Sequence, residues 1–187
     1  MPVDNMVVAT YNTHIGAGDA VQALQKAGFA TGSLSIAGKD HYLGDQIVAF
    51  YHLGGRTRQS GKYRDFWASM WDQLSGAAFI DTPAIGPVLM AGPLAAWVFE
   101  ALEGVAMVDG LSVVGAGLYT VGMSTETILG YEAALRGDQL LLFAEGNPAE
   151  ARMAHATLER TSPAAMNVHD TYNPGPVTDT VTAGAVS

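Results

Sequence analysis

Apolar and polar positions change period along this chain, and the first period is that of a strand. The β-branched run MVVATYN (6–12) predicts a strand. A helical period follows it, between Thr13 as N-cap and Gly28 just past the helix end. Two more apolar runs, 34–37 and 46–53, predict strands. The N-terminal part of the chain therefore predicts a strand–helix–strand unit and one further strand.

The far end of the chain repeats this pattern. Residues 138–146 predict a strand, and residues 147–160 predict a helix. Asn147 can cap this helix, with Pro148 at its first position and Glu150 at its third, close to a capping box. The segment AAMNVHD then predicts a last strand. Both ends are thus strand–helix–strand units, which we expect to fold together.

Two such units predict an α+β fold with the split βαβ arrangement of a ferredoxin-like sheet. A Gly-rich apolar helical hairpin would interrupt that sheet as an insertion. The predicted organisation is a ferredoxin-like domain from residues 5–55 and 124–170, an insertion at 56–123 and a C-terminal arm at 171–187.

The insertion is the most apolar part of the chain. After a basic stretch at 56–64 it continues with an amphipathic segment, 65–80, that places Trp67 and Trp71 on one helical face. The stretch TPAIGPVLMAGPLAAWVF (82–99) follows without a single charge, and 105–123 is similarly rich in Gly and small apolar residues. We expect these last two segments to be the helices of the hairpin.

Small residues recur four apart in the hairpin, a spacing that lets helix backbones approach closely in lipid or in an oligomer. We therefore predict a homo-oligomer. The β-rich run at 177–182 in the arm favours addition of a strand to a neighbour's sheet. The predicted oligomer interface is made of Ala91, Gly92, Ala95, Ala96, Ala106, Gly110, Ala116, Val177 and Val181.

A membrane is the alternative partner. Pro83, Pro87 and Pro93 interrupt the first apolar segment and Asp109 lies in the second, which disfavours a true span. A basic cluster and two Trp residues can instead anchor the chain to an anionic surface. The residues of that predicted surface are Arg56, Arg58, Lys62, Arg64, Trp67 and Trp71.

Composition narrows the class of protein. Charged residues make up 14% of the 187, below the roughly 25% of an ordinary soluble domain, so more surface than usual is expected to face a subunit or a bilayer. The formal net charge of −9 argues against nucleic-acid binding. Cysteine is absent, and the first residues lack a basic, apolar leader. We expect a cytoplasmic protein, with membrane association as the alternative.

The order of segments resembles a bacterial family. LQKAGF, LSIAGKD, a Trp-rich helix, IGPVLMAGPLAAWVFEALEG, GLYTVGM and YEAAL follow one another across residues 6–160. They are similar to heat-induced or general stress proteins, which are often described as membrane proteins of unknown function. The resemblance implies a bacterial stress-associated protein and brings no catalytic residues with it. Asp109 and the tail after residue 170 depart from the family pattern.

The sequence offers few residue groups suited to catalysis, metal binding or phosphate binding. Asp40, His41 and Asp45 lie close in sequence but without metal-ligand spacing. His14 and His169, at the ends of predicted elements, could meet across the sheet, but single His residues at such positions are more often simply exposed. The Gly-rich IGAGDA matches no phosphate-loop pattern.

Two carboxylates in the insertion, Glu100 and Glu103, fit a polar hairpin tip better than acid–base chemistry. We therefore predict no catalytic residue, no metal and no cofactor. The leading hypothesis is a non-enzymatic, self-assembling stress protein. The alternatives are a membrane-attached stress protein, and an enzyme or small-molecule-binding protein with a pocket between sheet and insertion.

Overall fold

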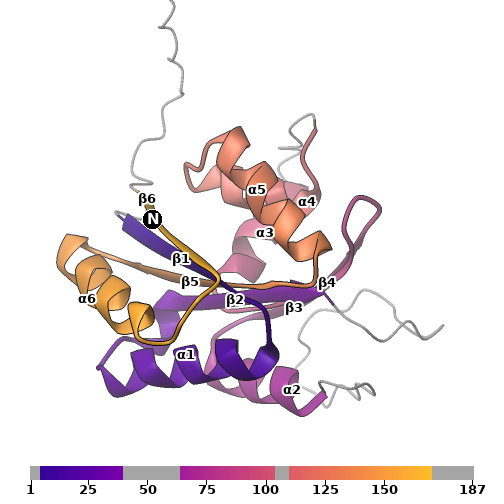
Figure 1. Ribbon diagram of the computed structural model, residues 1–187. Helices are drawn as coiled ribbons and strands as arrows, with labels where there is room; N and C mark the ends of the chain where they lie inside the picture. Colours follow the sequence, from indigo (N-terminus) through magenta and orange to yellow (C-terminus); the bar gives the residue numbers. More distant parts are fainter. Residues whose placement is uncertain (1–4, 40–63, 104–109, 170–187) are drawn as a thin grey trace, which may run out of the picture.

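An antiparallel sheet forms the centre of the computed structural model, which describes residues 5–39, 64–103 and 110–169 (Figure 1). Within these residues the sheet has six strands, in the order β3–β4–β2–β5–β1–β6. Every neighbouring pair is antiparallel. The strands are β1 (Asn5–Tyr11), β2 (Leu34–Lys39), β3 (Ala77–Thr82), β4 (Gly86–Ala91), β5 (Leu140–Gly146) and β6 (Ala165–His169). The chain therefore has an α+β fold, as predicted.

Helices cover both faces of the sheet (Figure 1). One layer consists of α1 (His14–Lys26), α2 (Arg64–Gln73) and α6 (Pro148–Glu159). The other consists of α3 (Leu94–Glu103), α4 (Val113–Thr120) and α5 (Thr125–Arg136). A short 3-10 turn, η1 (Thr31–Ser33), leads into β2.

The two layers explain why the central strands are apolar on both sides. In β1, Val7 and Ala9 face the layer of α1, α2 and α6, whereas Met6 and Val8 face the opposite layer. All four side chains are buried. Successive residues of a strand point to opposite faces of the sheet. A sheet with helices on both faces therefore needs apolar side chains on both faces.

The helix caps predicted at Thr13 and Asn147 are confirmed, and Ser124 caps a third helix in the same way. The side chains of Thr13, Ser124 and Asn147 accept hydrogen bonds from backbone N–H groups in the first turns of α1, α5 and α6. Asn147 and Glu150 form the full capping box, with Pro148 as the first helical residue. These short polar signals lie next to the elements they define, so they are readable without tertiary information.

The predicted helix through 82–99 is wrong over most of its length. Residues 77–82 and 86–91 pair as the antiparallel strands β3 and β4, and helix α3 begins at Leu94. β4 is buried over its last four residues, so its apolar run has no alternation to distinguish strand from helix. At Gly92, φ is +98° and an added Cβ would lie 2.1 Å from the Leu34 carbonyl oxygen. The turn from β4 into α3 therefore requires glycine.

Small residues bring α3 and α4 together inside the chain. A Cβ added to Gly117 would lie 2.9 Å from Val98 Cγ2 and 3.0 Å from the Val98 backbone. Both helices also contribute to the core above the sheet. No helix among residues 5–39, 64–103 and 110–169 is long and apolar enough to cross a membrane. The predicted strand at 46–53 and the predicted arm at 171–187 lie outside the described residues.

Candidate functional site: the β6 edge of the sheet

The two ends of the sheet differ in exposure. At one end, five of the six residues of β3 are buried. At the other end, β6 has no buried residue, and Ala165, Asn167 and Val168 are exposed. Within the described part of the chain, β6 pairs only with β1. Among the described residues, β6 is therefore the edge strand whose side chains are the more exposed.

The sequence of β6 does little to protect this edge. Natural edge strands are commonly protected by Lys, Pro, inward charges or bulges. β6 reads AMNVH, with no proline or carboxylate, and its register with β1 runs without interruption from Ala165 to His169. Val168 is 51% exposed. The outer edge thus presents backbone hydrogen-bonding groups beside an apolar side chain.

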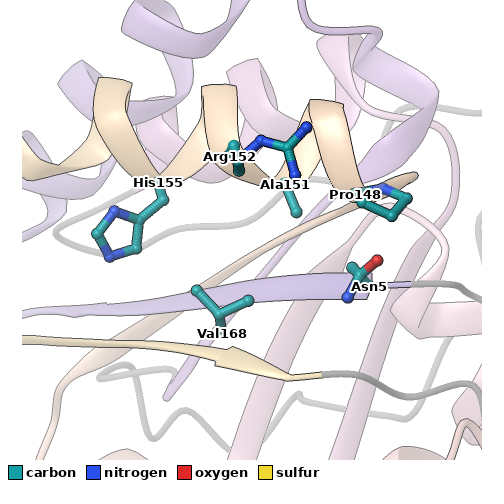
Figure 2. A pocket seen from close by; sticks show the side chains of 6 residues that line it. All are labelled: Asn5, Pro148, Ala151, Arg152, His155 and Val168. Atoms are coloured by element: carbon teal, nitrogen blue, oxygen red, sulfur yellow. The ribbon is translucent and has the colours of Figure 1, made fainter.

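A pocket of about 480 Å³ lies beside β6, on the side of the sheet that α6 covers (Figure 2). Val168 extends toward it from β6, and His155 extends toward it from α6. Its lining combines an apolar part with three polar side chains. The lining residues are Asn5, Pro148, Ala151, Arg152, His155 and Val168.

One cationic side chain, Arg152, lines this pocket, and two carboxylates lie near the two ends of α6. Arg152 is exposed and makes no ion pair with a described residue. His155 Nδ1 lies 4.0 Å from a Glu159 carboxylate oxygen, one turn further along α6. At the start of α6, Glu150 accepts a hydrogen bond from the Asn147 N–H at 2.8 Å. The guanidinium is therefore the pocket's uncompensated charge.

On the opposite side of the sheet, β6 is attached to α5 through two aromatic rings. Tyr131 Oη and His169 Nε2 are 2.5 Å apart, and the rings meet edge to face with centroids 5.8 Å apart. Burial raises the pKa of Tyr131 to about 12, so its hydroxyl keeps its proton. Burial lowers the pKa of His169, which favours the neutral ring as acceptor.

Glu145 lies in the same row of the sheet. Met6 pairs with Glu145 on one side and with His169 on the other, so all three point to the α5 face. Glu145 Oε2 is buried and has no hydrogen-bond partner among the described residues. Burial raises the pKa of this carboxyl to about 7. This face of the edge therefore carries a carboxyl group, Glu145, that titrates near neutral pH.

The predicted interface residues of the hairpin are mostly internal. Ala91, Ala95 and Ala116 are buried within their own chain, as is Gly92. Ala96 and Gly110 are exposed. Ala106, Val177 and Val181 lie outside the described residues, as do Arg56, Arg58 and Lys62 of the predicted anionic-surface contact.

The predicted Trp face points inward. Trp67 is 1% exposed and packs with Phe66, their ring centroids 5.2 Å apart. Trp71 Nε1 donates a hydrogen bond to the Met90 carbonyl of β4 at 3.0 Å. Arg64 is the first residue of the helix that carries them. The apolar face of α2 thus packs on the sheet instead of facing a membrane surface.

His14 and His169, which the sequence offered as a possible pair, do not meet. The His14 ring lies 5.0 Å from Phe66, under the sheet, whereas His169 contacts Tyr131 above it. Glu100 and Glu103 are exposed on α3. Asp40, His41, Asp45 and Asp109 lie outside the described residues. Among the residues that are described, no group of three His, Asp or Glu side chains is placed to hold a metal ion.

Sequence reasoning missed the pocket beside β6. The sequence indicates this pocket only by the spacing of Arg152 and His155, which are three apart on a helix and so share a face. Comparisons with protein-family models, with curated proteins and with solved structures found no match to this chain. The geometry of the β6 edge is therefore the feature of the molecule that points to a function.

Proposed function

We propose that this chain is a non-enzymatic protein that self-assembles by pairing β6 with the β6 of a second copy. The observation that carries the proposal is the contrast between the two edge strands: most side chains of β3 are buried, whereas none of those of β6 is. An unpaired edge offers ready hydrogen bonds to another strand, and a continuous sheet across two subunits satisfies them.

The topology supports this choice of edge. Strands β6, β1, β5 and β2, with α1 and α6 as connections, correspond to the split βαβ order of a ferredoxin-like sheet. In this interpretation, the segment between β2 and α5 is an insertion. Its strands β4 and β3 continue the sheet beyond β2, so within the described residues β6 is the edge strand that belongs to the ferredoxin-like unit itself.

Symmetry and charge favour a second copy as the partner. An antiparallel strand can pair with an identical strand about a two-fold axis, so β6 is its own complement. The chain has a net charge of −9, which opposes contact between copies over most surfaces. β6 carries no carboxylate, so pairing of two β6 strands brings no carboxylates of these strands together.

The hairpin itself is a poorer interface. Its small residues are used inside the chain, where Gly117 contacts Val98. The association with stress rests on the resemblance of residues 6–160 and stays a prediction. Attachment to a membrane is not favoured by the buried position of Trp67.

The symmetric register gives a direct test, because Asn167 at the centre of β6 would face the Asn167 of the second copy. Asn167→Asp and Asn167→Lys each place like charges opposite one another and should yield monomers by light scattering. Mixing the two variants should restore the wild-type size. Gln22 is exposed on α1, so Gln22→Asp and Gln22→Lys are the matched controls. A monomeric wild type, or unchanged size in both Asn167 variants, would overturn the proposal.

A further inference from the structure

The pocket beneath α6 has the features of a small-molecule site. Its volume of about 480 Å³ lies within the range of ligand pockets, about 300–1,000 Å³. Such sites combine an apolar wall with a few polar groups that fix orientation. Here Pro148, Ala151 and Val168 supply the apolar wall, and Arg152, His155 and Asn5 supply the polar groups (Figure 2).

We propose that this pocket binds a small monocarboxylate with an apolar body. The Arg152 guanidinium would hold the carboxylate through two parallel N–H donors, the arrangement for which arginine is best suited. The apolar body would lie on Val168 and Ala151. His155 and the Asn5 amide offer further hydrogen bonds at the rim.

The charges near the pocket select a carboxylate over a phosphate. A phosphate at a helix N-terminus needs free backbone N–H groups. At the start of α6, the Asn147 side chain already accepts from the Glu150 N–H at 2.8 Å. Glu150 adds a negative charge there, and Glu159 lies at the other end beside His155. Both carboxylates repel a dianion about twice as strongly as a monoanion, which favours a monoanion at Arg152.

Ligand binding in the pocket does not require pairing of β6 with a second copy. The pocket lies between α6 and the face of the sheet, whereas the proposed assembly uses the outer backbone edge of β6. Binding is therefore expected in the monomeric Asn167→Asp variant as well as in the wild type. This separates failure of the binding proposal from failure of the assembly proposal.

The test is titration calorimetry on the full chain with four probes: benzoate, propionate, benzamide and inorganic phosphate. We expect benzoate to bind more tightly than propionate, because its larger apolar body covers more of the wall. Benzamide and phosphate should bind at least tenfold more weakly. Benzamide lacks the charge, and phosphate lacks the apolar body.

Matched variants locate the site. Arg152→Gln should lower benzoate affinity about tenfold or more, while Arg160→Gln, a second exposed arginine just past the end of α6, should leave it unchanged. Circular dichroism verifies that both variants are folded. Three results would overturn the proposal: no heat with benzoate at millimolar concentration, equal affinity in Arg152→Gln, or phosphate binding as tightly as benzoate.

Discussion

The Glu132 carboxylate on α5 accepts two hydrogen bonds from Ser112, the N-cap of α4. The Ser112 N–H donates at 2.7 Å and its hydroxyl at 2.6 Å, both to Oε2. The Ser112 hydroxyl oxygen in turn accepts from the Gly115 N–H at 3.2 Å. A buried carboxylate thus lies at the positive end of a short helix, where the helix dipole and both donors stabilise it. The pair joins α4 to α5 beneath the protein surface.

Removing this carboxylate should be costly. Glu132 is 2% exposed, so Glu132→Ala leaves the Ser112 donors buried without an acceptor. We expect a loss of about 2–4 kcal/mol in the free energy of unfolding, measured by urea denaturation. Glu132→Gln keeps an acceptor oxygen and should cost less than the alanine variant. Exposed Glu126→Ala, on the same helix, should change stability by no more than about 0.5 kcal/mol. Equal values for Glu132→Ala and Glu126→Ala would contradict the capping role.

Two helical glycines should respond in opposite directions to alanine. Gly117→Ala puts a methyl group within 3.0 Å of the Val98 backbone, so α3 and α4 must separate. We expect destabilisation of about 1–3 kcal/mol. Gly130, on α5, has nothing within 4 Å of an added Cβ, so Gly130→Ala should stabilise by up to about 1 kcal/mol through helix propensity. Thermal unfolding of the pair checks both signs. A neutral Gly117→Ala would show that the helix contact is not close.

The parts of the fold that were predictable are those with local signals. Thr13, Ser124 and Asn147 each mark a helix start because a short side chain accepts from the first turn. The helix predicted over 82–99 was wrong because this segment has no such local signal. Its strand is apolar on both faces, and whether it is β4 or a helix depends on pairing with β2 and β3, which no local pattern records.

The candidate site was harder to predict than the fold. Arg152 and His155 share a helix face, but the pocket also needs Asn5 and Val168, which lie at opposite ends of the described chain. Only the order of the strands brings β1 and β6 beside α6. Similarly, the aromatic spacing of Trp67 and Trp71 revealed a buried face without revealing what covers it.

Glu145 should make the protein less stable as pH rises through the acid range. Its folded pKa, about 7, is above the ordinary value of 4.5, so the folded state holds the proton more tightly. Below pH about 4.5 both states are protonated. Between pH about 4.5 and 7 the unfolded state ionises first, and stability falls. Partial exposure limits the fall to about 1–2 kcal/mol. Glu145→Gln should remove it in urea denaturation across this range. A slope that persists in the variant would contradict the assignment.

His169 should act in the opposite direction. Burial lowers its folded pKa, so the unfolded state takes the proton first as pH falls below about 6.5, and stability is lost through the folded pKa. The groups on the described elements around it are Tyr131, which stays neutral in this range, and Glu145, which lies across Met6 in the same row. His169→Gln keeps an acceptor for the Tyr131 hydroxyl and should flatten the acid limb, most clearly in the Glu145→Gln background.

Tyr131→Phe separates two contributions to stability: the hydrogen bond between Tyr131 and His169, and the titration of His169. It removes the hydroxyl that contacts His169 but leaves the burial that lowers the pKa of the imidazole. We therefore expect a loss of about 1 kcal/mol at neutral pH, with the acid slope retained. Urea denaturation between pH 5 and 8 measures both quantities. If Tyr131→Phe abolishes the slope while His169→Gln preserves it, the contact between α5 and β6 is not controlled by the charge of His169.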